Sequence, residues 1–128
     1  MIYLDTSVAL GHLLAEDGSP PPALWQESLV SSRLLEYEAW TRIHAKRLKA
    51  SHGELLRQLL ARIAFLEMTP TVLARALEPF PVAVRTLDAL HLASLEFLRS
   101  QGQDLALASY DERLVAAARR LGIEIADV

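Results

Sequence analysis

Residues 2 to 10 read Ile2-Tyr3-Leu4-Asp5-Thr6-Ser7-Val8-Ala9-Leu10. A short apolar run ends here in a carboxylate, and two hydroxyl residues able to cap a helix follow it. This order predicts a strand, a turn and the start of a helix. In an open α/β sheet, ligands bind in the crevice beyond the carboxyl ends of the strands. Asp5 is therefore expected at the edge of the sheet where such folds carry out their chemistry.

Segments with strand spacing and helix spacing alternate along the rest of the sequence. Further strands are predicted at 29–32, 65–68, 105–108 and 123–125. Helices are predicted at 6–15, 23–27, 33–50, 55–66, 71–77, 84–100 and 111–121. The segment 65–68 also fits the end of the preceding helix, and we favour the strand. Gly53 is expected to separate the two middle helices into a helical hairpin, and the proline-rich segment 16–22 to form a turn.

Strands that alternate with helices imply an α/β fold with a central, mostly parallel sheet of four to five strands and helices on both faces. At 128 residues the chain is expected to form a single domain, 1–128. A chain of this size buries roughly two-thirds of the surface it exposes when unfolded, so a core forms without disulfides. The absence of cysteine excludes disulfides and thiolate metal sites.

Hydrophobic residues make up 52% of the sequence, but no apolar run approaches the roughly 20 residues of a membrane span. No basic segment precedes a long apolar one near residue 1, so no signal peptide is predicted. We therefore expect a cytoplasmic protein without a membrane partner. The net charge of −3 argues against binding nucleic acid through a general positive field. Local phosphate contacts stay open, because arginine binds phosphate oxygens two at a time.

Asp88 is the most informative acid. It lies in the apolar helix segment Leu87-Asp88-Ala89-Leu90-His91-Leu92-Ala93, where an unpaired buried carboxylate costs several kcal/mol. The plain alternatives are a pair with Arg85 or stabilisation of the helix dipole. Asp111 follows a predicted strand and opens a helix, so it is either a helix cap or a second site residue.

Glu38 lies in the first turns of the helix that follows the strand 29–32, and helical spacing alone does not separate it from Glu36. Together with Asp5, Asp88 and Asp111, it falls where the carboxyl ends of parallel strands meet. Carboxylates gathered there repel each other unless a cation neutralises them. Oxygen ligands without thiolates favour Mg²⁺ or Mn²⁺, and such an ion suits the hydrolysis of phosphodiester bonds.

Four motifs resemble, in order, those of PIN-domain ribonucleases. They are Ile2-Tyr3-Leu4-Asp5-Thr6-Ser7, Ser32-Arg33-Leu34-Leu35-Glu36-Tyr37-Glu38, Arg85-Thr86-Leu87-Asp88-Ala89-Leu90-His91-Leu92-Ala93 and Ser109-Tyr110-Asp111. The greatest similarity is to VapC-type toxins of bacterial toxin–antitoxin pairs, and it covers essentially the whole chain. The resemblance implies a three-layer PIN-like fold with a protruding helical hairpin.

The resemblance also implies an acidic metal-binding cluster, matched here by Asp5, Glu38, Asp88 and Asp111. Glu38, not Glu36, matches the glutamate of the family. Thr6 and Ser109 match polar positions that support the site. The implied activity is that of an endoribonuclease with Mg²⁺ or Mn²⁺, and the implied partners are an antitoxin and a second copy of the chain. The alternative of another class is a non-catalytic PIN-like module that binds RNA or protein.

His91 shares a helix face with Asp88, and a packed histidine with a hydrogen-bonded ring is favoured over a ligand or base. The basic residues of the hairpin around Arg42 fit a solvated helix face or an RNA contact. Arg33 and Arg85 are further candidate phosphate contacts, because they lie close in sequence to the site motifs. A phosphoacceptor receiver domain is excluded, because it needs a lysine late in the chain and both lysines are early. A haloacid-dehalogenase phosphatase is excluded because Ser7 stands where that class needs a second aspartate.

Overall fold

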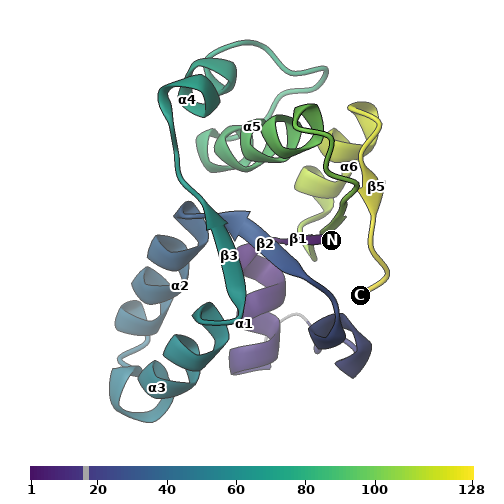
Figure 1. Ribbon diagram of the computed structural model, residues 1–128. Helices are drawn as coiled ribbons and strands as arrows, with labels where there is room; N and C mark the ends of the chain where they lie inside the picture. Colours follow the sequence, from purple (N-terminus) through teal and green to yellow (C-terminus); the bar gives the residue numbers. More distant parts are fainter. Residues whose placement is uncertain (16–17) are drawn as a thin grey trace.

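The computed structural model describes residues 1–15 and 18–128. Within them the chain forms a sheet of five parallel strands in the order β3-β2-β1-β4-β5 (Figure 1). The strands are β1 (Ile2–Leu4), β2 (Leu29–Ser32), β3 (Ile63–Leu66), β4 (Ala106–Ala108) and β5 (Glu124–Ile125). The helices are α1 (Thr6–Leu14), the 3₁₀ helix η1 (Pro22–Gln26), α2 (Leu34–Ala45), α3 (Lys49–Leu60), α4 (Pro70–Ala76), α5 (Thr86–Ser100) and α6 (Glu112–Arg120).

The strand β1 lies at the centre of the sheet. Tyr3 pairs with Val30 of β2 on one side and with Leu107 of β4 on the other. The Ser31 hydroxyl donates a 2.6 Å hydrogen bond to the Leu4 carbonyl oxygen, a further link between the first two strands. The carboxyl ends of three neighbouring strands therefore lie side by side at the edge that carries Asp5.

Alternating side chains of β1 build the two halves of the core. Tyr3 packs into one cluster with Leu92 of α5 and Leu114 of α6. Leu4 packs into the opposite cluster with Val8 of α1, along with residues of α2 and α3. Figure 1 shows α4, α5 and α6 on one face of the sheet and α1, α2 and α3 on the other. The predicted three-layer α/β/α arrangement is confirmed.

The helical hairpin is present, but its turn is not at the predicted place. The first helix ends at Ala45, and the chain reverses at Lys46–Leu48, where Arg47 adopts a left-handed backbone conformation with φ 55°. Gly53 lies inside α3 and is buried against Trp40 of α2, whose ring would be 3.6 Å from an added Cβ atom. The glycine therefore lies where the two helices pack together, and the helix predicted at 33–50 extended five residues too far at its C-terminal end.

The third strand also differs from the prediction. It runs from Ile63 to Leu66, and α3 ends at Leu60. Ile63 pairs with Leu29 of β2 and is buried, so it belongs to the sheet and not to the predicted helix 55–66. The prediction failed because periodicity alone does not separate a short continuous apolar run such as Ile63–Leu66 from a buried helix segment.

The ends of other elements shift by one or two residues. The helix predicted at 84–100 begins at Thr86, and the segment predicted as a helix at 23–27 is the 3₁₀ helix η1. The cap of α1 is Asp5 itself, whose carboxylate accepts the Ser7 backbone N–H, and not Thr6 or Ser7. The turn predicted at 16–22 includes residues 16 and 17, which lie outside the described residues. No helix in the described part of the chain is long and apolar enough to cross a membrane.

Candidate active site

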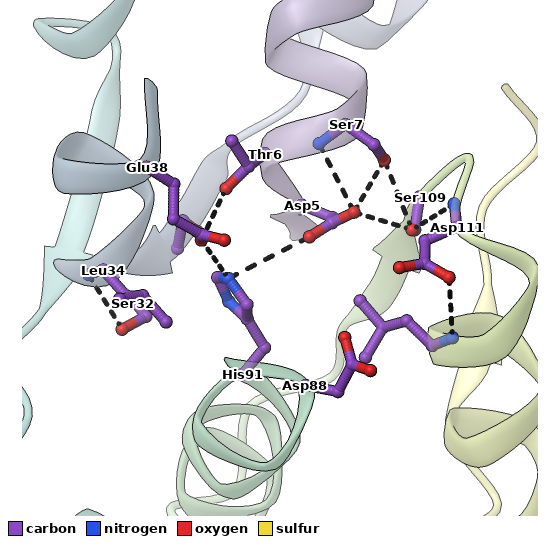
Figure 2. A network of polar contacts seen from close by, with 12 residues as sticks. Asp5, Thr6, Ser7, Ser32, Leu34, Glu38, Asp88, His91, Ser109 and Asp111 are labelled. Carbon is purple, nitrogen blue, oxygen red and sulfur yellow. Dashed lines mark hydrogen bonds and ion pairs between the residues drawn. The ribbon is translucent and has the colours of Figure 1, made fainter. Parts of the chain in front are cut away.

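Four carboxylates line one cavity at the carboxyl edge of the sheet. Asp5 ends β1, Glu38 lies on α2, Asp88 on α5, and Asp111 follows β4. The cavity has a volume of about 470 Å³. Its other lining residues are Thr6, Ser7, Arg85, Thr86, Leu87 and His91. Figure 2 shows how these acidic side chains, from four separate segments, surround the same space. A larger cavity of about 710 Å³, between α4 and α5, is mainly apolar and lacks this acidic set.

Asp5 is buried and held by hydroxyl groups. Its Oδ2 atom accepts hydrogen bonds from the Ser7 hydroxyl at 2.6 Å and from the Ser109 hydroxyl at 2.8 Å. The Ser7 backbone N–H contacts the same oxygen at 3.4 Å. Ser109 follows β4, so the two central strands jointly fix this carboxylate. Ser109 therefore contacts Asp5 directly.

Glu38 is held by Thr6 and His91. Its Oε1 atom accepts hydrogen bonds from Thr6 Oγ1 at 2.8 Å and from His91 Nε2 at 2.7 Å (Figure 2). Glu36, its competitor in the sequence, does not line the cavity and instead forms a 3.6 Å ion pair with Arg33. The structure therefore brings Glu38, and not Glu36, to the other acids.

Asp88 and Asp111 share a single arginine. Arg85 Nε donates to Asp88 Oδ2 at 3.0 Å, and Arg85 Nη2 donates to Asp111 Oδ2 at 2.7 Å. The hydrogen bond to Asp88 and the charges of both acids raise the pKa of Arg85 above its ordinary value. Asp111 also caps α6, since its Oδ1 accepts the backbone N–H groups of Arg113 and Leu114. Asp88 is therefore paired with Arg85 and Asp111 caps a helix, as expected if their roles were only structural, and both acids also line the cavity.

Some oxygen atoms of these carboxylates accept hydrogen bonds and others do not. Within the described residues, Asp5 Oδ1, Glu38 Oε2 and Asp88 Oδ1 accept no hydrogen bond, although His91 Nε2 lies 4.0 Å from Asp5 Oδ1. Both oxygens of Asp111 are occupied, one by the helix cap and one by Arg85. Each of the first three acids therefore keeps one oxygen for a ligand of the cavity.

His91 is buried, and both of its ring nitrogens form hydrogen bonds, as predicted. Nδ1 and the Tyr3 hydroxyl are 2.7 Å apart, while Nε2 contacts Glu38. Burial disfavours the charged ring, but the hydrogen bond to Glu38 and the negative charges of Asp5, Glu38 and Asp88 raise the pKa of His91 overall. The sequence did not reveal its contact with Glu38, which is 53 positions away. Its spacing of three residues from Asp88 was the only signal.

Two candidate RNA contacts lie outside the cavity. Arg33 forms a 2.7 Å ion pair with Glu67 and stacks over the Phe65 ring, so its guanidinium is already engaged. Arg42 is exposed on α2, one helical turn beyond Glu38. Arg85 is the one of the three candidates that lines the cavity.

The donor set fits a hard cation. Across residues 1–15 and 18–128, no three His, Asp or Glu side chains are arranged to hold one metal ion directly. Mg²⁺ in proteins is bound through one or two carboxylates and keeps several waters, so close convergence of all four acids is not required. The three carboxylate oxygens without a hydrogen bond and the volume of the cavity suit a hydrated ion of this kind.

Comparison with known proteins agrees with this geometry. The family model of the PIN domain matches residues 2–121. Ribonuclease VapC47 of Mycobacterium tuberculosis (strain CDC 1551 / Oshkosh) is 30% identical to the chain, over 95% of this chain and 93% of the relative. Ribonuclease VapC35 and Ribonuclease VapC46 of Mycobacterium tuberculosis (strain ATCC 25618 / H37Rv) are 31% and 33% identical, over 98% and 97% of this chain and 95% of each relative. The chain belongs to the PIN-domain family, in the group of the VapC proteins.

Proposed function

We propose that this chain is a metal-dependent endoribonuclease, the toxin of a type II toxin–antitoxin pair. The observation that carries the proposal is the cavity in which Asp5, Glu38, Asp88 and Asp111 meet from four separate segments. The relatives that match nearly the whole chain are named ribonucleases, and this supports RNA as the substrate.

In this proposal, Asp5, Glu38 and Asp88 hold a hydrated Mg²⁺ or Mn²⁺, directly or through its waters, by the oxygens that accept no hydrogen bond from the described residues. Asp111 joins the acidic set when Arg85 moves away from it. When bound, such an ion activates a water and stabilises the negative charge that develops on the phosphate oxygens. The contribution of the chain is to orient the carboxylates and to hold them in one place.

Arg85 is the residue best placed to contact the scissile phosphate. More than half of its side chain is exposed, at 58%, and its planar fork already binds two carboxylates at the mouth of the cavity. A phosphate offers the same pairs of oxygens. Arg42 and Arg33 are proposed as contacts to the flanking RNA backbone. Their positive charges offset locally the net negative charge of the protein.

The same function implies protein partners. We propose a homodimer and a complex with an antitoxin in the cytoplasm. Large apolar side chains on α3, on and directly after α4, and at the start of α5 support this, because they are exposed to solvent: Leu55, Leu73, Leu77 and Leu87. Light scattering of the purified protein is expected to give the mass of a dimer at micromolar concentration. A monomer that co-purifies with no other protein would contradict the proposed assembly.

The activity is tested with purified protein, a structured RNA and Mn²⁺. We expect cleavage that EDTA abolishes and that falls at least about a hundredfold in Asp5→Asn, because the substitution removes the charge of a central ligand. Glu36→Gln is the matched control, since this acid lies outside the cavity on the same helix as Glu38. RNA that stays intact with Mg²⁺ and with Mn²⁺ would favour the non-catalytic binding module instead.

A further inference from the structure

We propose that His91 is a positioning residue that holds the Oε1 atom of Glu38, so that the Oε2 atom faces the cavity as the metal-binding oxygen. The inference rests on the proposed function, because the ligand of Oε2 is the divalent ion. It assigns to His91 a role toward Glu38 and none in direct contact with the ion or the RNA.

The two oxygens of Glu38 have different surroundings. Oε1 accepts two hydrogen bonds, from Thr6 Oγ1 and from His91 Nε2, at 2.8 and 2.7 Å. Oε2 accepts none from the residues that the structure describes. Because Oε1 is engaged by two donors from two different helices, the carboxylate is not free to exchange its oxygens by rotation about its last bond. Oε2 is left toward the space that Asp5 and Asp88 also line.

The orientation of the His91 ring is fixed from its other side. The Tyr3 oxygen accepts the Ser32 backbone N–H at 3.2 Å, so its own proton is available to His91 Nδ1 at 2.7 Å. This leaves the hydrogen of a neutral ring on Nε2, and a charged ring carries one there too. In either state of the ring, Nε2 is therefore the donor to Glu38.

The contact also couples two helices. His91 lies one turn after Asp88 on α5, while Glu38 lies on α2 across the cavity. The hydrogen bond between them fixes the position of the Glu38 carboxylate relative to Asp88. A glutamate side chain that ends in a partly exposed carboxylate, 22% exposed here, loses rotamer freedom when an ion binds it. His91 removes part of that freedom before the ion arrives, so the ion binds more tightly.

Two amide variants of His91 test this positioning. The amide nitrogen of His91→Gln falls near the place of Nε2 and still reaches Glu38, whereas that of His91→Asn falls near Nδ1 and does not. We expect Mn²⁺ affinity, measured from the electron paramagnetic resonance signal of free Mn²⁺, to fall about tenfold in His91→Asn, as for other residues that orient metal ligands. His91→Gln is expected to stay close to wild type. Equal losses in the two variants would overturn the inference.

A double-mutant cycle separates positioning from general damage to the fold. In a Glu38→Ala background, His91→Asn is expected to have no further effect on Mn²⁺ affinity, because the group that it positions is absent. A further tenfold loss there would show that His91 acts through the fold and would contradict the proposal. Thermal unfolding of each variant establishes that the compared proteins are folded.

A spectroscopic signature distinguishes failure of this inference from failure of the proposed function. In ¹⁵N-labelled wild-type protein without metal, the His91 Nε2–H proton is expected to be visible and protected from solvent exchange, and to be lost in Glu38→Ala. If wild type binds no Mn²⁺ but shows this signal, the proposed function fails while the contact stands. If wild type binds Mn²⁺ and the signal is absent, the positioning role of His91 is wrong.

Discussion

The two sides of the acidic cavity are held together in different ways. On one side, Asp5 and Glu38 accept hydrogen bonds from uncharged hydroxyls and from the buried His91. On the other, Asp88 and Asp111 are bridged by Arg85, a cation whose side chain is 58% exposed. Hydroxyl donors orient a carboxylate without cancelling its charge, whereas an arginine supplies the cation itself. The carboxylates of Asp5 and Glu38 are therefore ready for a metal ion, whereas those of Asp88 and Asp111 must release Arg85 before the ion can take its place.

The largest expected effect is on metal-induced stability. A divalent ion that binds only the native protein stabilises it by about 2.7 kcal/mol at a hundred times its dissociation constant. We expect Mn²⁺ to raise the melting temperature of wild type and to raise that of Asp88→Asn much less. The asparagine keeps the acceptor for the Arg85 backbone N–H, so the metal-free protein should stay folded. An equal rise in both proteins would remove Asp88 from the ligand set.

A smaller effect is expected from removing a hydroxyl on the Asp5 side. Ser109 donates to Asp5 and accepts the Asp111 backbone N–H at 2.9 Å, so Ser109→Ala removes one donor to Asp5 and leaves the Asp111 backbone N–H without this acceptor. Denaturant unfolding without metal should show a loss of about 1–3 kcal/mol. Arg33→Ala is the matched surface variant, because it removes an ion pair with an exposed acid and should cost at most about 1 kcal/mol. Similar losses in both would mean that the Asp5 side is no more rigid than the surface.

The smallest expected effect is a change in Mn²⁺ affinity that has opposite signs for variants on the two sides of the cavity. In Arg85→Ala the cation that competes for Asp88 and Asp111 is gone, so Mn²⁺ should bind a few-fold more tightly, about 1 kcal/mol. RNA cleavage by the same variant should fall, because the phosphate contact is lost with it. Thr6→Val, which removes a donor to Glu38, should weaken Mn²⁺ binding instead. Weaker binding in both variants would contradict the distinction between the sides.

The sequence predicted the parts of the fold that depend on local pattern. The strand before Asp5, the parallel sheet and the helices on both of its faces follow from apolar runs and from the alternation of strands and helices. The position of the hairpin turn was not predicted correctly. Gly53 packs against Trp40 and does not form the turn, and the chain reverses at Arg47, a residue with no turn preference. The role of this glycine therefore depends on packing between the two helices, which local turn propensity does not reveal.

The sequence pointed to the residues of the candidate site but not to the contacts between them. Strand ends and the resemblance pointed to Asp5, Glu38, Asp88 and Asp111, and the structure brings all four to one cavity. His91 is hydrogen-bonded to Tyr3, which is 88 positions away in the chain, and to Glu38, which is 53 positions away. No rule of sequence spacing predicts contacts between residues so far apart. Arg85 was considered both as the ion-pair partner of Asp88 and as an RNA contact, and the structure pairs it with Asp88 and also with Asp111.

The most direct test of this account is the anomalous diffraction of a crystal of the protein grown with Mn²⁺. We expect a Mn²⁺ peak in the cavity, at about 2.0–2.3 Å from at least one of Asp5 Oδ1, Glu38 Oε2 and Asp88 Oδ1, with Arg85 withdrawn from Asp88 and Asp111. A cavity without a peak at saturating Mn²⁺, or an ion bound while Arg85 keeps both ion pairs, would contradict it.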